Sequence, residues 1–375
     1  MEDIRLYVRE DFSGLPELLR DEKEVFLVHD RNVSWAAERI GALCALRGAL
    51  ALDASEAAKN LGTVTDICRF LLESGADRGA LVLALGGGIT TDMAGFAACI
   101  YKRGVRFATL PTTLLSQVDA GIGGKTGVNL DGYKNILGVI RQPEFVYIAG
   151  NTLETLPESE FRSGVAEMLK TFIISDAPHY RRALELLRSG RRADAELIRA
   201  AAAIKCGVVE RDPYERGERR VLNLGHTVGH AVEWWQARRA APETACPAGE
   251  CPQGTAGKGL PCGQTPAGYR ANDPALRAYS HGEAVAIGMV QAARLSEALG
   301  VCRRGLAAQL EADFASVGLP TACPVPPAEM RQAIAKDKKA DGGSVHFVLI
   351  RDIGKVEVRL LPVDTIIQLL ETASL

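Results

Sequence analysis

Short apolar runs alternate with helical stretches through the first part of the chain. Five runs have the length and composition of buried strands: Glu24–His29, Ala49–Leu52, Ala80–Leu85, Arg106–Leu110 and Phe145–Ile148. Strands that alternate with helices usually form one parallel sheet covered on both faces. The pattern therefore predicts an α/β domain of the nucleotide-binding type over residues 1–150.

The strand pattern fades after this point, and helical periodicity replaces it. Glu158–Ile174 and Ala195–Val209 carry apolar residues at helical spacing, which predicts a mainly α-helical second domain over residues 151–375. A late exception is Ser344–Ile350, which with Lys355–Leu361 predicts a small hairpin. Repeated prolines and glycines from about 238 to 280 predict a surface insertion within the second domain.

Composition narrows the class of protein. The 375 residues include 44 Lys+Arg and 46 Asp+Glu, a net charge of −2, so neither nucleic acid nor a membrane surface is an expected partner. Nine cysteines, an odd number in a chain large enough to fill its own core, favour a reduced, cytoplasmic setting over a disulfide framework. No secretion signal and no membrane span is predicted.

A glycine-rich turn follows the third predicted strand. Gly86–Asp92 (GGGITTD) lies between Ala80–Leu85 and a helical stretch, where backbone N–H groups and the helix start favour a phosphate. The turn is not the GxGxxG fingerprint, and glycines that only allow a tight turn are the alternative. Asp30 ends the first predicted strand, where it suits either a ribose hydroxyl or a turn or cap.

A second glycine-rich stretch carries cations. Gly123–Asn129 (GGKTGVN) contains Lys125, and Lys134 and Asn135 follow it. Flexible backbone beside two lysines suits a phosphorylated or carboxylated ligand. The spacing excludes a P-loop, because Asp119 stands where the first glycine of that motif is required.

The predicted helix Glu158–Ile174 has a polar face opposite its apolar stripe. Ser163, Glu167 and Lys170 share that face at spacings i, i+4 and i+7. From the spacing alone, an ordinary solvated face is the more frequent outcome. A solvated surface is likewise the expectation for the lysines of Lys336–Lys339 and for Lys205, Arg219 and Arg220.

Three histidines offer partners for that helix. His226 and His230 stand at i and i+4 of one predicted helix, and His281 stands at a predicted helix start. Neutral imidazoles with a carboxylate are ligands expected for a catalytic Zn²⁺, although an HxxxH pair alone is weak support. The absence of HExxH excludes a zinc protease of that type.

Together these stretches resemble the 3-dehydroquinate synthase family of sugar phosphate cyclases. The resemblance rests on GGGITTDMAGFAACIYKRG, LPTTLLSQVDAGIGGKTGVN, SGVAEMLK, LNLGHTVGHAVE and HGEAVAIGM, which occur in the family's order. It implies a Rossmann-like N-terminal domain and an α-helical C-terminal domain that binds metal and substrate.

The resemblance also implies site residues, carried over position by position. The implied metal ligands are Glu167, His226 and His281. The implied NAD-binding residues are Asp30, Glu56, Lys59, Gly87, Gly88, Asp92, Thr112, Thr113, Lys125, Lys134, Thr152 and Thr155. The implied substrate-binding residues are Lys125, Asn135, Lys170, Lys205, Arg219, Asn223, His230 and Lys338. Arg103 matches an arginine that reaches a neighbouring subunit's phosphate pocket, which implies a homodimer.

The implied reaction converts 3-deoxy-D-arabino-heptulosonate 7-phosphate to 3-dehydroquinate and phosphate in the shikimate pathway, with NAD and one Zn or Co ion as cofactors. NAD oxidises a ring carbinol transiently, phosphate is eliminated, the hydride returns, and ring opening with an aldol closure follows. Three alternatives stay open: another sugar phosphate cyclase, a metal- and NAD-dependent polyol or glycerol-phosphate dehydrogenase, and a non-catalytic binding protein.

One departure from the family is the distance between two implied ligands. His226 and His281 are 55 residues apart, and the extra sequence contains Cys246, Cys251 and Cys262. Their C-x4-C-x10-C spacing fits no common zinc knuckle, so an exposed loop is favoured over a second metal site.

Overall fold

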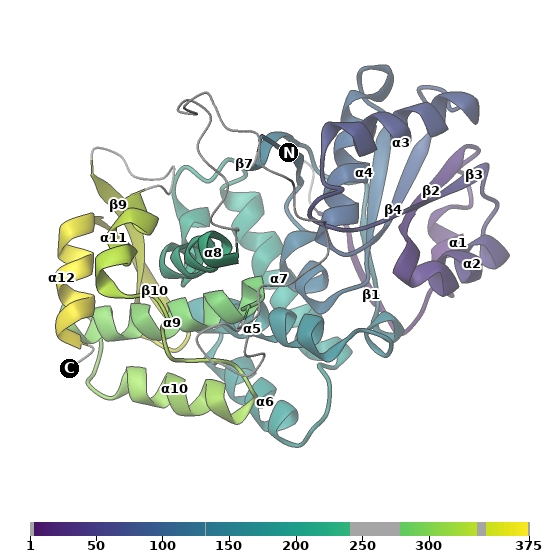
Figure 1. The fold of residues 1–375 in the computed structure, drawn as a ribbon. Helices are drawn as coiled ribbons and strands as arrows, with labels where there is room; N and C mark the ends of the chain where they lie inside the picture. Colours follow the sequence, from purple (N-terminus) through teal and green to yellow (C-terminus); the bar gives the residue numbers. More distant parts are fainter. Residues whose placement is uncertain (1–3, 132, 241–277, 336–342, 374–375) are drawn as a thin grey trace, which may run out of the picture.

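The protein has an α/β half and a mainly helical half, and the computed structural model describes residues 4–131, 133–240, 278–335 and 343–373. In Figure 1 the purple and blue N-terminal half contains a twisted sheet flanked by helices, and the green to yellow C-terminal half is mainly helical. The predicted fold class is therefore confirmed. None of the helices in the described ranges has the length and apolar character needed to cross a membrane.

Six parallel strands form the main sheet, in the order β1-β8-β5-β4-β2-β3. Their bounds are β1 Leu6–Arg9, β2 Val25–Asp30, β3 Gly48–Leu52, β4 Leu81–Gly86, β5 Arg106–Pro111 and β8 Val146–Ala149. The five predicted strands are confirmed. Strand β1 was not predicted, because four residues at a sheet edge carry little apolar pattern.

Helices cover both faces of this sheet. They are α1 Leu15–Leu18, α2 Ser34–Leu43, α3 Leu61–Glu73 and α4 Gly88–Ile100, with short turns η1 Arg31–Val33 and η2 Tyr101–Arg103. In β4, Leu83 and Leu85 pack in the core that includes α1 and α2, whereas Val82 and Ala84 pack in the core that includes α3 and α4. Alternation of side chains between two covered faces explains why this strand is apolar at every position.

A two-stranded hairpin, β6 (Lys125–Leu130) and β7 (Tyr133–Ile140), packs on α4. The sequence did not predict strands in this glycine-rich stretch, where the structure has an antiparallel hairpin. Gly127 and Gly138 face each other across the hairpin, and a Cβ on either would collide with the backbone of the opposite strand. The glycines therefore permit a close crossing of two ordered strands.

The C-terminal half contains α5 Glu158–Ser175, α6 Ala177–Arg188, α7 Ala195–Arg211, α8 His226–Ala240, α9 His281–Ala298, α10 Leu306–Ser316, α11 Pro327–Ala335 and α12 Val363–Ala373. Short helical turns are η3 Ser116–Ala120, η4 Gly150–Leu153 and η5 Glu218–Asn223. The predicted hairpin is confirmed as β9 Ser344–Asp352 and β10 Lys355–Pro362. The expected insertion of 238–280 begins later than predicted, since α8 continues to Ala240, and residues 241–277 with their three cysteines lie outside the described residues.

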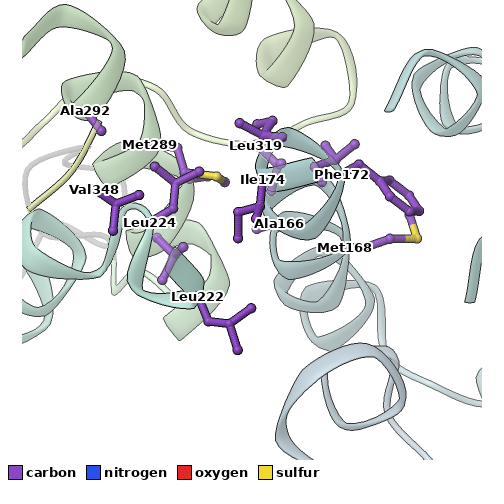
Figure 2. Close-up of a cluster of buried hydrophobic side chains, with 14 of the residues drawn as sticks. Ala166, Met168, Phe172, Ile174, Leu222, Leu224, Met289, Ala292, Leu319 and Val348 are labelled. Atoms are coloured by element: carbon purple, nitrogen blue, oxygen red, sulfur yellow. The ribbon is translucent and has the colours of Figure 1, made fainter. Parts of the chain in front are cut away.

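One hydrophobic core spans the helical half and reaches the sheet. Figure 2 shows part of it, with Met168 and Phe172 on one side of α5 and Met289 of α9 beside Leu224. Val146 and Ile148 of β8 belong to the same core. The β1–β8 side of the sheet is therefore packed directly against the helices that carry the site.

Candidate active site

A glutamate and two histidines from three helices meet in the helical half. Glu167 lies in the middle of α5 and is 0% exposed, and His226 and His281 are the first residues of α8 and α9. Ligand atoms of the three lie within 4.8 Å of one another. His281 Nε2 is 3.4 Å and His226 Nε2 is 3.8 Å from Glu167 Oε1.

Close helix packing produces this meeting. Gly282 N donates to Ser163 Oγ at 3.0 Å, and a Cβ on Gly282 would collide with the Ser163 carbonyl. A Cβ on Gly288 would likewise collide with the carbonyl of Gly225, which directly precedes α8. Glycines at both crossings let α5, the start of α8 and α9 approach closely enough to bring the three side chains together.

The donor set fits a divalent metal ion. Two imidazoles and a carboxylate are a known catalytic zinc set, and within the described residues Glu167 Oε1, which faces both imidazoles, is buried without a hydrogen-bond partner. His226 Nδ1 faces the Leu224 carbonyl at 3.2 Å and His281 Nδ1 faces Glu233 Oε1 at 3.4 Å. Both Nε2 atoms are thus turned toward Glu167, as metal-ligating histidines usually are.

The charges around the two imidazoles favour a bound cation. Burial and the nearby charge of Lys170 lower the pKa of His226 to about 3, which keeps this imidazole neutral. Burial alone would lower the pKa of His281, but contacts with Glu167 and Glu233 raise it to about 10. Two carboxylates therefore surround the imidazole of His281, where a metal ion would supply the compensating charge.

Two lysines and an aspartate extend the cluster. Lys170 Nζ is 2.5 Å from Glu167 Oε2 and 3.9 Å from Asp119 Oδ2, and Lys205 forms an ion pair with Asp119. Burial opposes the charge on Asp119, but the two lysines hold its pKa below the usual range. Burial and the charge of Lys170 lower the pKa of Lys205.

The structure contradicts the expectation that the polar face of helix α5 is solvated. Ser163, Glu167 and Lys170 form a buried face, not a solvated one, with Lys170 only 1% exposed. Lys205 and Arg219 are buried too, so the solvated default was wrong for both. Periodicity identifies a polar helix face, but only the packing of α9 and η3 against α5 determines that it is covered.

A second polar group joins η5 to the β6–β7 hairpin. Arg219 is 3% exposed and donates to the Pro213 carbonyl at 2.6 Å and the Gly123 carbonyl at 3.3 Å. Glu215 accepts from Asn223 Nδ2 at 2.6 Å and forms an ion pair with Lys125. The predicted substrate residues Lys125, Arg219 and Asn223 are therefore brought together around Glu215.

A third group links α4 to the hairpin. Lys59 Nζ lies 2.5 Å from Asp92 Oδ2 and 2.6 Å from Asn135 Oδ1. Burial raises the pKa of Asp92 to about 6, against the opposing charge of Lys59. Asn129 accepts from Asn135 N at 2.9 Å and donates to Glu56 Oε1 at 2.8 Å. Residues expected at the NAD and substrate sites therefore share one hydrogen-bonded network.

The glycine turn lies at the carboxyl edge of the sheet. His29 of β2 pairs with Leu85 of β4, so Asp30 and the turn before α4 end neighbouring strands. Among the described residues no side chain caps α4, which leaves its first N–H groups for an anion. A Cβ on Gly87 would lie 3.1 Å from Thr113 Cγ2, so the backbone approaches closely here.

Other predicted NAD residues differ in their surroundings. Asp30 accepts from Asn32 N at 2.9 Å, which is the cap role that the sequence left open. Thr112 is buried at the end of β5. Thr152 is buried, with its hydroxyl donating to Ala149 O at 2.7 Å and accepting from Gln117 at 3.0 Å, whereas Thr155 is exposed.

One predicted residue of the described ranges, Arg103, is not brought to this site. Arg103 is exposed in η2 and lines a groove of about 570 Å³ with Asp77, Arg78 and Lys102, near the amino ends of β4 and β5. That edge of the sheet is opposite the glycine turn. Lys338 lies outside the described residues.

Sequence reasoning missed three carboxylates that the structure places in the site: Asp119, Glu215 and Glu233. Asp119 follows β5 and contacts two lysines, and Glu215 contacts Lys125 and Asn223. Glu233 had a signal, because it stands at i+7 from His226 and i+3 from His230 on the same helix. His230 lies beside both ligand histidines, with its ring centroid 5.4 Å from that of His226 and 6.4 Å from that of His281.

Two family models match the chain. The model described as 3-dehydroquinate synthase N-terminal matches residues 49–163, and the model described as 3-dehydroquinate synthase C-terminal matches residues 164–242 and 271–340. A 3-dehydroquinate synthase of Citrifermentans bemidjiense is 40% identical over 311 residues, covering 82% of this chain and 75% of that protein. One from Halorhodospira halophila is 36% identical over 353 residues, covering 93% of this chain and 89% of that protein.

Solved structures agree with the fold. A 2-epi-5-epi-valiolone synthase from Streptomyces hygroscopicus subsp. jinggangensis, with NAD⁺ and Zn²⁺ bound, has a TM-score of 0.78 and 26% identity, covering 100% of this chain and 97% of that one. A 2-deoxy-scyllo-inosose synthase has a TM-score of 0.77 and 22% identity, covering 99% of each chain. A probable glycerol dehydrogenase from Sinorhizobium meliloti shares the fold less closely, with a TM-score of 0.55, 14% identity, and coverage of 100% of this chain and 97% of that one.

Proposed function

The chain belongs to the 3-dehydroquinate synthase family, and from this membership we propose that it converts 3-deoxy-D-arabino-heptulosonate 7-phosphate to 3-dehydroquinate and phosphate. The enzyme is a carbon–oxygen lyase that uses NAD and one divalent metal ion. The observation that carries the proposal is the convergence of Glu167, His226 and His281 beside a cluster of buried cations. Such a site suits an anionic polyol substrate.

The two cofactors supply the redox and Lewis-acid chemistry. Bound NAD would supply reversible hydride transfer at a ring carbinol without being consumed. Glu167, His226 and His281 would hold the metal ion, which would supply Lewis-acid stabilisation of a developing alkoxide worth several kcal/mol. His230 lies one helical turn from His226 and orients a substrate hydroxyl or moves its proton.

The cations orient the substrate in this proposal. Lys125, Lys170, Lys205 and Arg219 bind its carboxylate and phosphate, and Asn135 and Asn223 donate to its oxygens. Asp119 keeps Lys170 and Lys205 charged and fixed in position, since it contacts both. Fixed orientation is what several steps in one pocket require.

The NAD residues follow the carboxyl edge of the sheet. The pyrophosphate is held at the Gly87–Gly88 turn and the start of α4, with Thr112 and Thr113 alongside. Asp30, Glu56, Lys59, Asp92, Lys134, Thr152 and Thr155 complete the proposed set. The hydroxyl of Thr152 is engaged within the protein, where it donates to Ala149 O and accepts from Gln117.

The reaction is tested by phosphate release from the heptulosonate phosphate with catalytic NAD, with and without a chelator. We expect phosphate release that the chelator abolishes, with no net NADH absorbance. Stoichiometric NADH would instead indicate a polyol or glycerol-phosphate dehydrogenase. Phosphate release from a different sugar phosphate only would indicate another cyclase, an alternative supported by the similarity to valiolone and inosose synthases.

The metal assignment is tested separately with His226→Ala. We expect loss of both bound metal and turnover with the unfolding transition retained, because one of three ligands is removed at a helix start. Elemental analysis and activity are measured on the same sample. Full metal occupancy with normal turnover contradicts the assignment.

We also propose a cytoplasmic homodimer in which Arg103 reaches the partner's phosphate site. The exposure of Arg103 at the opposite edge of the sheet supports this proposal. Mixing Arg103→Ala with His226→Ala subunits should restore activity, since each mixed dimer then contains one intact site. No restoration after verified subunit exchange contradicts a shared site.

A further inference from the structure

Two side chains of α8, one helical turn apart, contact the start of α9. Gln236 Oε1 accepts from Tyr279 N at 2.8 Å, and Gln236 Nε2 donates to Tyr279 O at 2.8 Å. Both backbone groups of Tyr279 are thus held by one amide. His281, the ligand, follows two residues later, and Glu233 Oε1 accepts from its Nδ1 at 3.4 Å.

Of the three expected ligands, His281 has the weakest local support. Glu167 is in the middle of a buried helix, and His226 turns its Nδ1 toward the backbone carbonyl of Leu224. The His281 side chain is 34% exposed, against 14% for His226. A capping box of Ser280 and Glu283 sets the backbone at the start of α9, but it does not fix the imidazole ring.

Glu233 fixes the imidazole ring of His281, which the capping box does not do. Its contact with Nδ1 selects the tautomer and ring orientation that present Nε2 to Glu167, from which it is 3.4 Å away. The same oxygen of Glu233 is 3.9 Å from Lys134 Nζ on β7, so the contact also faces the α/β half.

We propose that Glu233 and Gln236 are positioning residues of the metal site: Gln236 holds the backbone before α9, and Glu233 orients the His281 imidazole for metal binding. The inference rests on the proposed function, which assigns His281 as a ligand. It explains how His281 reaches its place although 55 residues separate it from His226 in the sequence. Two contacts from α8 set the position of the returning chain, whatever the length of the connection.

The test is metal affinity, measured on the full chain by competition with a chromophoric chelator for Zn²⁺. Glu233→Gln keeps the size of the side chain and removes its charge, and Gln236→Met removes both hydrogen bonds at similar volume. Loss of a partner behind a metal ligand typically weakens metal binding about 10–100-fold, which is the expectation for each variant. The visible spectrum of the Co²⁺-loaded protein should change in Glu233→Gln, because the orientation of one ligand changes.

A matched control is Glu311→Gln, which breaks an ion pair with Arg294 nearer the far end of α9. It loses the same charge on a neighbouring helix and should retain wild-type metal affinity. In a His281→Ala background, titrated at Zn²⁺ concentrations high enough to load the two remaining ligands, Glu233→Gln should cause no further loss of affinity, because its effect passes through that imidazole.

Wild-type affinity and an unchanged Co²⁺ spectrum in both α8 variants would overturn the inference. A further loss in the His281→Ala background would also overturn it, since the effect would then be general. Failure of the proposed metal site is distinguishable, because the wild-type protein would then bind no metal.

Discussion

Gly164→Ala tests whether close packing sets the geometry of the active site. Gly164 is buried in α5, one turn before Glu167. A Cβ at this position would lie 2.5 Å from the backbone N of Leu115 and 2.5 Å from Leu114 Cβ. Because backbone cannot rotate out of the way, α5 must move away from the segment that leads to Asp119.

The distances give the size of the effect. Real Cβ contacts are not shorter than 3.0 Å, so α5 must move by at least about 0.5 Å from the 2.5 Å starting distance. Overpacking of this kind costs about 1–3 kcal/mol, and the better helix propensity of alanine offsets up to about 1 kcal/mol. A shift of about 0.5 Å at Glu167 also exceeds the roughly 0.2 Å tolerance of metal–ligand distances, so metal affinity should fall.

Urea unfolding and chelator competition measure the two effects. Gly41→Ala is the matched control, because Gly41 lies in α2 with Leu46 Cδ1 as its nearest neighbour at 3.9 Å. It gains the same helix propensity without a collision, so it should stabilise the protein by up to about 1 kcal/mol. Equal stabilisation by both substitutions, with unchanged metal affinity in Gly164→Ala, would refute the packing argument.

Two further predictions concern buried charge. Asp119→Asn leaves Lys170 and Lys205 without their shared partner, so the free energy of unfolding should fall by about 3–5 kcal/mol in denaturant titration, with loss of turnover. For Asp92, burial raises the folded-state pKa from 3.8 to about 6, so its contribution is present at low pH and is lost as pH rises through about 6. Asp92→Asn should therefore gain about 3 kcal/mol in unfolding free energy relative to wild type between about pH 4 and pH 7.

Each of these two predictions has an outcome that would contradict it. Wild-type stability of Asp119→Asn would mean that the two lysines need no shared anion. A difference between Asp92→Asn and wild type that stays constant with pH would mean that Asp92 does not titrate in this range. Metal-free protein is used for the two unfolding measurements, so that cofactor loss at low pH does not contribute, and the turnover of Asp119→Asn is measured on metal-loaded protein.

The apolar pattern was sufficient for most of the fold but not for its edges and crossings. Strands such as Leu81–Gly86 are predictable because both faces are buried and every position is apolar. Leu6–Arg9 escaped prediction because four residues at the edge of a sheet carry little apolar pattern. The β6–β7 hairpin escaped prediction because its glycines, which allow close crossing of two strands, are also typical of loops.

The candidate site, like the fold, was predictable from the sequence only in part. His226 and His230 share a helix, so their proximity is readable from spacing, and their meeting with Glu167 was implied only by resemblance. The burial of Lys170 and the contacts of Asp119 depend on which helices pack together, which no local pattern encodes. Glu233 could have been predicted, because it lies on the same helix face as the two histidines.

The pairing of β1 with β8 has a consequence for the order of events during synthesis. Leu6 emerges from the ribosome early, but its neighbour in the sheet is Val146, and Ile4 N donates to Glu210 Oε1 in α7 at 3.1 Å. At roughly 5–20 residues per second the wait for Val146 is on the order of ten seconds. The first strand of the chain is therefore among the last to be placed in the sheet, and a nascent chain stalled before β8 emerges would carry an unpaired edge at β5.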